Sequence, residues 1–172
     1  QMVNRERHFR EHRQFDKLTP LADAGYLRSQ LALALPQAES SQQPLSLLTI
    51  DLDDFHQVNA RYGHQEGDRV LQLVCQLLLM SLRRHDLLCR LAGDRFAVLL
   101  PNTLEEQAQT MAREISESIA HLACRSAQQG ERILLRATVV AVMARQDDAD
   151  SLLQRSNLAM AHAKQALQLK RA

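Results

Sequence analysis

The sequence predicts an α+β domain in which helices pack on a mostly antiparallel sheet, and two observations carry this prediction. The first is the stretch 87–100, where two short apolar strands flank a Gly-Asp pair typical of hairpin turns. The second is the order of the other patterns, since helical and strand-like segments occur on both sides of that hairpin. A hairpin this apolar belongs inside a sheet, with Asp94 and Arg95 presented side by side at its tip.

Length, composition and charge limit the classes of protein to which this chain can belong. At 172 residues and 45% hydrophobic content, the chain suffices for one domain with a packed core and a short appendage. A net charge of +1 does not indicate the basic surface that binds nucleic acid. No apolar run approaches the length of a membrane span. The three cysteines lie far apart in apolar runs and indicate reduced thiols. We therefore expect a cytoplasmic domain, preceded at 1–17 by a charged linker helix from an upstream domain.

The remaining elements follow from periodicity and from helix and strand end signals. A helix over 22–35 ends before Pro36, and a buried strand over 45–53 ends in carboxylates. After a turn at 62–68, apolar residues at three- and four-residue spacing predict a helix over about 66–83. Thr103 and Glu106 form a capping box that opens the next helix. A β-rich run at 133–143 and a final helix from the acidic 147–150 cluster through Lys170 complete the order.

Asp51 and Asp53 close the first strand, and alternation places both carboxylates on one face, with Leu52 on the other. Three spaced motifs around them resemble the GGDEF family, the diguanylate cyclases, over about residues 16–168. The matching stretches are Asp51-Leu52-Asp53-Asp54-Phe55, Gly63-His64-Gln65-Glu66-Gly67-Asp68 and the tip Ala92-Gly93-Asp94-Arg95-Phe96. The resemblance implies a palm-like, ferredoxin-related fold with a central five-stranded sheet, spanning 18–172. It also implies the joining of two GTP molecules into cyclic di-GMP with Mg²⁺.

The resemblance assigns roles to individual residues. Asp51 and Asp94 would be the metal carboxylates, assisted by the Leu52 carbonyl, with Asp94 also the vestigial catalytic position. Asn59 and Asp68 would read the guanine edge, and Lys164 would contact phosphate. Considered without the resemblance, Asp68 is equally a helix-capping residue and Lys164 a solvated helix lysine.

Two departures stand in the signature itself. Arg95 replaces a Glu and changes the local charge by two units beside the metal position. At about 5 Å and an effective dielectric of about 20, each unit charge is worth on the order of 3 kcal/mol before screening. Arg95 could instead hold a phosphate. Ala92 replaces a Gly, and His56, Ala60 and Gln168 replace further charged residues of the family pattern. Together these changes predict weakened Mg²⁺ binding and lost turnover.

One more motif is retained before the hairpin. Arg83 and Asp86 form an Arg-x-x-Asp pattern with the spacing that the family uses for its inhibitory cyclic di-GMP site. An Arg can grip guanine O6 and N7, while the Asp accepts from ring N–H groups. The alternative is a simple i, i+3 ion pair at a helix end.

The sequence thus predicts a degenerate, catalytically inactive GGDEF domain that acts as a regulatory module binding GTP or cyclic di-GMP. Two alternatives remain open: a weakly active diguanylate cyclase and a purely structural dimerisation domain. The expected partners are adjacent domains of a longer signalling protein, of which an EAL phosphodiesterase is the usual companion, and a second copy in a homodimer.

Overall fold

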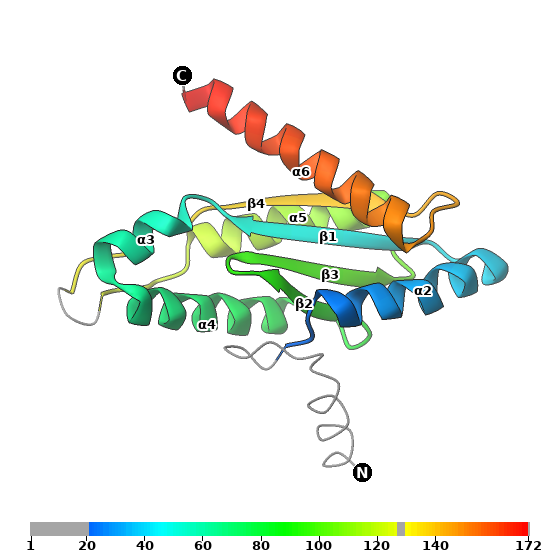
Figure 1. Ribbon diagram of the computed structural model, residues 1–172, viewed down its shortest axis with the longest axis horizontal. Coiled ribbons are helices and arrows are strands. Elements are labelled where there is room, and N and C mark those ends of the chain that lie inside the picture. Colours follow the sequence, from blue (N-terminus) through cyan, green and yellow to red (C-terminus); the bar gives the residue numbers. More distant parts are fainter. Residues whose placement is uncertain (1–20, 127–129, 172) are drawn as a thin grey trace, which may run out of the picture.

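The computed structural model describes residues 21–126 and 130–171, so the linker helix predicted at 1–17 lies outside the described residues (Figure 1). The chain order is helix, strand, two helices, hairpin, helix, strand, helix. The elements are α2 (Ala24–Ser41), β1 (Leu45–Leu52), α3 (Phe55–Tyr62), α4 (His64–Ser81), β2 (Leu87–Ala92), β3 (Arg95–Pro101), α5 (Glu105–Ala120), β4 (Ala137–Met143) and α6 (Ala149–Arg171). Within these segments, no helix combines the length and apolar character that crossing a bilayer requires.

The sheet has the order β2-β3-β1-β4, and every neighbouring pair is antiparallel. The α+β class and the antiparallel hairpin are therefore confirmed. The expected fifth strand is wrong for the described residues, whose sheet has four strands. Because β1 is central, its last residues are flanked on both sides: Asp51 lies opposite Arg95 on β3 and opposite Thr138 on β4.

Helices cover both faces of the sheet, which explains why β1 and β3 are apolar almost throughout (Figure 1). On one face, β1 residues Leu48, Ile50 and Leu52 join a core cluster formed with α3, α4 and α5. On the other face, Leu45 and Leu47 join a cluster formed with α2 and α6. Alternation along β1 thus divides its side chains between two cores.

Two local predictions need correction, and one helix was missed. The helix expected to end before Pro36 continues to Ser41, because Leu35 and Ala38 still pack into the core beneath α2. Helix α3 was not predicted. The predicted capping box is also wrong, since the backbone N–H of Leu104 donates to the Gln107 side chain at 2.9 Å.

The β-rich run also divides differently from the expectation. Only 137–143 forms a strand, while Ile133 and Leu135 are buried in the α4–α5 core outside the sheet. Their apolar character reflects burial in a connecting segment, and periodicity alone does not separate this from a strand.

Candidate active site

The carboxylates at the end of β1 meet a lysine from α6. Lys164 Nζ forms an ion pair with Asp53 and lies 3.9 Å from Asp51 Oδ2. Asp53 also accepts a 2.8 Å hydrogen bond from the Thr138 hydroxyl on β4, and its side chain is only 7% exposed. The predicted common face of the two carboxylates is confirmed by this shared contact. Lys164 is therefore committed to carboxylates within the described chain.

Asp51 stands where charges of both signs converge. Burial raises the pKa of the Asp51 carboxyl, and the neighbouring Asp94 and Asp53 carboxylates push it the same way. Lys164 and Arg95 oppose that rise in pKa. Two cations and three carboxylates thus share one partly desolvated corner of the sheet.

The hairpin tip is held close to β1 by its backbone. The Leu52 N–H donates to the Asp94 carbonyl at 3.1 Å. A β-bulge falls between Arg90 and Ala92, and the buried Arg90 side chain donates from Nε to the Gly93 carbonyl at 2.9 Å. The hairpin does turn over 93–94, but without the positive φ that favours such residues. The bulge provides the extra twist instead.

Arg95 begins β3 and lies opposite Asp51 in the strand register. Its side chain is half-buried, and its Nε atom is buried without a hydrogen-bond partner among the described residues. A guanidinium in this position adds positive charge beside Asp51 and Asp94, where the family pattern has a carboxylate.

Asn59 and Asp68 come from neighbouring helices, α3 and α4. The Asn59 side chain packs over Gly67, so closely that a Cβ on that glycine would lie 1.8 Å from Asn59 Oδ1. Gly67 therefore permits the close approach of α3 and α4, and the following residue, Asp68, is exposed. The structure brings these two predicted residues onto adjoining helices.

Arg83 and Asp86 lie between α4 and β2, at the other end of the hairpin from its tip. The Asp86 side chain is 1% exposed and accepts from the Arg83 backbone N–H at 2.8 Å and from its guanidinium at 2.9 Å. The guanidinium also donates to the Thr103 hydroxyl at 2.5 Å. The i, i+3 ion pair, which the sequence analysis gave as the alternative to a cyclic di-GMP site, is thus present. The Arg83 side chain nevertheless remains 48% exposed.

Sequence reasoning missed the contacts of three residues that order these sites: Arg90, Thr138 and Thr103, which it had assigned only to a capping box. Arg90 left a detectable signal, because an arginine within an apolar strand must find a buried partner. The other two left none, since their partners are distant in the sequence.

An antiparallel sheet between helix layers, with carboxylates gathered where β1 ends and the β2–β3 hairpin turns, defines the palm-like class expected from the motifs. Residues 13–169 match the family described as "Diguanylate cyclase, GGDEF domain". The match spans most of the chain, and the protein therefore belongs to the GGDEF family.

Individual relatives agree with this assignment. The chain is 32% identical to a diguanylate cyclase of Vibrio cholerae over 149 residues, which is 87% of this chain and 46% of that protein. It is 39% identical to the probable diguanylate cyclase DgcE of Escherichia coli over 60% of this chain and 9% of that protein. The chain thus spans less than half the length of these relatives.

Solved structures agree at the level of the fold. The GGDEF domain of TpbB from Pseudomonas aeruginosa superimposes with a TM-score of 0.83 at 32% identity, covering 88% of this chain and 89% of that chain. The coiled coil and GGDEF domain of DgcB from Caulobacter crescentus, in complex with c-di-GMP, superimposes with a TM-score of 0.87 at 21% identity, covering 96% of this chain and 87% of that one.

Proposed function

We propose that this chain is a catalytically inactive GGDEF domain that binds a guanine nucleotide and serves a regulatory role in cyclic di-GMP signalling. The observation that carries the proposal is the pairing of the β1 carboxylates with the protein's own cations. Lys164 engages Asp53 and approaches Asp51, and Arg95 stands opposite Asp51. The carboxylates that a cyclase would offer to Mg²⁺ are already partly neutralised.

The geometry argues against a good fit for a divalent cation. Mg²⁺ requires near-ideal octahedral oxygen coordination and is held by one or two carboxylates plus water and phosphate. Asp51, Asp53 and Asp94 share this corner, but across the described ranges no three His, Cys, Asp or Glu side chains are placed so that they could hold one metal ion. Arg95 adds a repulsive charge at the same corner. Asp51, Asp94 and the Leu52 carbonyl, the groups that would hold the metal ion, therefore do not fit Mg²⁺ well in this arrangement.

A cyclase assay tests the loss of turnover. Wild-type protein with GTP and Mg²⁺ is expected to form no cyclic di-GMP. Arg95→Glu restores the carboxylate of the family pattern and should strengthen Mg²⁺-dependent GTP binding at least tenfold, measured by calorimetry. Lys170→Glu, which reverses an exposed charge at the end of α6, is the matched control and should change nothing. Cyclic di-GMP made by the wild type and abolished by Asp51→Asn would establish the weakly active cyclase instead.

The regulatory ligand that we propose is cyclic di-GMP, bound through Arg83. Its guanidinium is half exposed beside a small groove of about 220 Å³, also lined by His85, Pro101 and Asn102. Both Asp86 carboxylate oxygens already accept hydrogen bonds from Arg83. We therefore assign Asp86 the role of orienting the guanidinium rather than that of contacting guanine.

Calorimetric titration with cyclic di-GMP tests this site. Wild-type protein should bind, Arg83→Ala should lose at least tenfold in affinity, and Arg84→Ala should bind as the wild type does. Arg83→Ala also leaves a buried carboxylate less well paired, so thermal melting must show that the variant is folded. Absent binding, or binding indifferent to Arg83, refutes the assignment. A structural dimerisation domain predicts no nucleotide affinity at either site. We expect the bound state to be passed to adjacent domains, such as an EAL phosphodiesterase.

A further inference from the structure

Arg95 differs from the other cations near the end of β1, because its guanidinium has no partner among the described residues. Lys164 forms an ion pair with Asp53, and Arg171 forms one with Asp54. The Arg95 Nε atom is buried without a hydrogen-bond partner, and none of the ion pairs found in the described ranges includes this side chain. Buried polar groups in proteins are almost always hydrogen-bonded, so this arginine lacks a partner that the described chain does not supply.

The strand register directs the Arg95 side chain into the candidate site. Arg95 lies directly opposite Asp51, and directly opposed residues of an antiparallel pair project from the same face of the sheet. Lys164 approaches Asp51 from α6 on that face. The Arg95 side chain is only half-buried, and its two Nη atoms are not among the buried unpaired atoms, so the outer edge of the guanidinium is open to a ligand.

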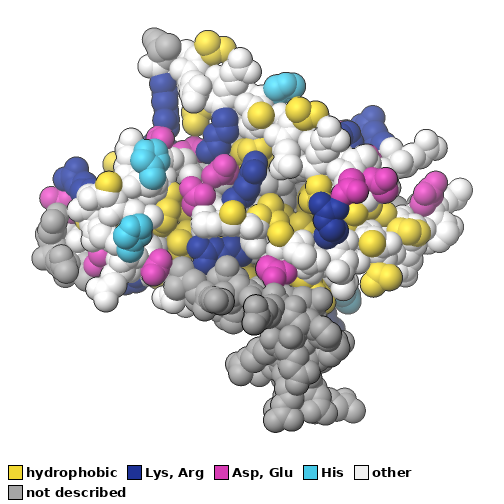
Figure 2. Space-filling model, in the orientation of Figure 1, with side chains coloured by type: hydrophobic (Ala, Val, Ile, Leu, Met, Phe, Trp, Pro, Cys, Tyr) yellow, Lys and Arg dark blue, Asp and Glu magenta, His cyan; other side chains and the backbone are white. Residues whose placement is uncertain are grey.

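We call this part of the site the β1 corner; it consists of Asp51, Asp53, Asp94, Arg95 and Lys164. Its balance of charge differs from that of the family pattern. Two cations face three carboxylates here, whereas a glutamate at position 95 would leave Lys164 alone against four. Figure 2 shows acidic and basic side chains close together on the face of the molecule that carries α6. A corner with four carboxylates needs a metal ion before it can accept an anionic phosphate, and the present corner has less need of one.

Arginine has the chemistry to take over this task. Its guanidinium stays charged at every accessible pH and presents N–H donors in a planar fork that matches two phosphate oxygens. A divalent cation in a nucleotide site neutralises phosphate oxygens in the same place, but it needs carboxylate ligands that are free to coordinate it. In this structure Asp53 is already engaged by Lys164 and by the Thr138 hydroxyl.

We infer that Arg95 takes the place of the metal ion, so that the phosphates of a guanine nucleotide bind at the β1 corner without a divalent cation. The inference rests on the proposed function, because it requires that a guanine nucleotide reaches this corner. Arg95 then donates to phosphate oxygens through its exposed edge, while Lys164 keeps Asp53 neutralised. The substitution that repels Mg²⁺ thus also supplies the group that replaces it.

Calorimetric titration of GTP in two buffers, one with EDTA and one with excess Mg²⁺, tests the inference. The wild type should bind GTP in EDTA at least as tightly as in Mg²⁺. Arg95→Glu should lose at least about tenfold in EDTA, since a charge-assisted hydrogen bond is removed, and should bind GTP more tightly in Mg²⁺ than in EDTA. A purely structural role for Arg95 would not reverse the dependence on metal.

A second comparison separates the phosphates from the base. Arg95→Met keeps a long aliphatic side chain without its charge, and should weaken GTP binding in EDTA at least about tenfold while leaving the affinity for guanosine unchanged. Arg95→Lys retains a positive charge and should bind GTP in EDTA more tightly than Arg95→Met does. Thermal melting verifies that each variant is folded.

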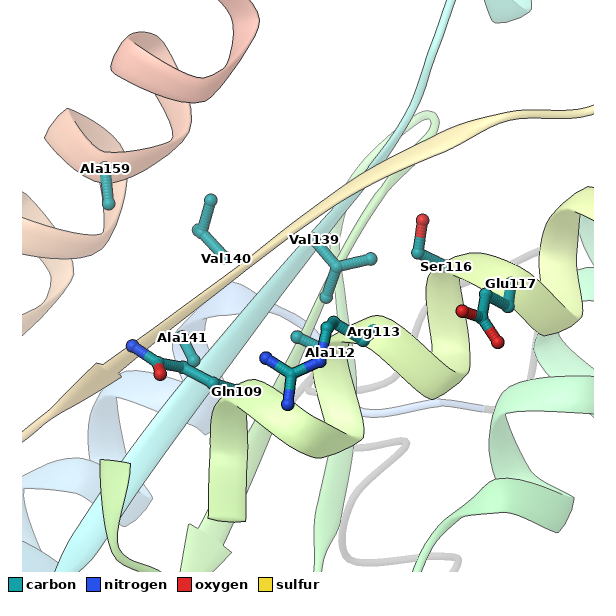
Figure 3. Close-up of a pocket in the computed structure, with 9 residues that line it drawn as sticks. All are labelled: Gln109, Ala112, Arg113, Ser116, Glu117, Val139, Val140, Ala141 and Ala159. Atoms are coloured by element: carbon teal, nitrogen blue, oxygen red, sulfur yellow. The ribbon is translucent and has the colours of Figure 1, made fainter. Parts of the chain in front are cut away.

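Arg113→Glu is the matched control, because it makes the same change of charge on the exposed surface of α5. Figure 3 shows Arg113 beside a groove of about 510 Å³ along β4, whose lining includes no residue of the β1 corner. This variant should bind GTP as the wild type does in both buffers.

The possible failures are distinguishable from failure of the proposed function. A wild type that binds GTP only with Mg²⁺, or an Arg95→Met variant that binds GTP in EDTA as tightly as the wild type, overturns the inference and leaves guanine-nucleotide binding intact. Absence of GTP binding in both buffers also overturns it. If cyclic di-GMP still binds through Arg83 in that case, the proposed regulatory function stands; if neither nucleotide binds, both proposals are refuted.

Discussion

Asp147 connects the end of β4 to the start of α6, and its replacement by Asn gives a sharp test of the electrostatics. The carboxylate accepts hydrogen bonds from the Arg145 backbone and the Ser151 hydroxyl, each at 2.8 Å, and from Arg155. Arg155 is the main reason that the pKa of Asp147 falls from 3.8 to about 2, with the two hydrogen bonds adding to it. A lowered carboxyl pKa stabilises the fold above the unfolded value, and this contribution is lost as pH falls from about 4 towards 2.

The size of the effect follows from the shift. A fall from 3.8 to about 2 corresponds to about 2.4 kcal/mol at most. The Arg155 side chain is 37% exposed, so solvent screening reduces this to about 1–2 kcal/mol. Asp147→Asn should therefore lower the free energy of unfolding by about 1–2 kcal/mol at pH 7.

Urea unfolding of both proteins between pH 7 and pH 3 provides the measurement. The gap between wild type and Asp147→Asn should stay constant down to about pH 4.5 and then narrow, because the wild type loses stability as Asp147 takes up a proton. Glu114→Gln, at an exposed position on α5, should track the wild type throughout. A gap that is the same at pH 3 and pH 7 would show that charge at Asp147 contributes nothing and that the effect is one of shape alone.

Three further substitutions test the packing described above. Leu31→Ala empties a fully buried position beneath α2 and should lower the free energy of unfolding by about 2–5 kcal/mol in urea titrations. Gly67→Ala drives a methyl into Asn59 and should both lower the melting temperature and weaken GTP binding, whereas a Gly25→Ala control should leave GTP affinity unchanged. Arg90→Met removes the donor to Gly93, so amide exchange at the tip should accelerate while exchange in the rest of β3 stays slow.

The sequence was sufficient for the elements whose signals are local. The Gly-Asp hairpin, the apolar strand that leads into the carboxylates and helix α4 all follow from periodicity and turn chemistry, and the structure confirms them. The predicted element boundaries were wrong where tertiary burial overrode a local signal. Helix α2, for example, continues through Pro36 because Leu35 and Ala38 still pack into the core.

The candidate site was predictable in its members but not in its pairings. The family resemblance pointed to Asp51, Asp94 and Lys164, but the position of Lys164 against Asp53 arises from a contact spanning 111 residues. Nothing in a linear pattern specifies which carboxylate a distant lysine selects. The α3 helix was missed for a different reason: Phe55, Val58 and Tyr62 did carry a helical spacing, but over only eight residues.

Helix α6 contacts the β1 corner through charged side chains, and Figure 1 shows its C-terminal half running out beyond the sheet. Lys164 grips Asp53, and Arg171 Nη1 lies 2.9 Å from Asp54 on the adjoining turn. Leu152, Ser156 and Met160 anchor the N-terminal half of the helix by burial, and two ion pairs tether its C-terminal half. A displacement of the C-terminal half would break the Lys164–Asp53 and Arg171–Asp54 ion pairs before it disturbed the buried residues. A force applied to α6 would therefore first change the charge balance at the β1 corner.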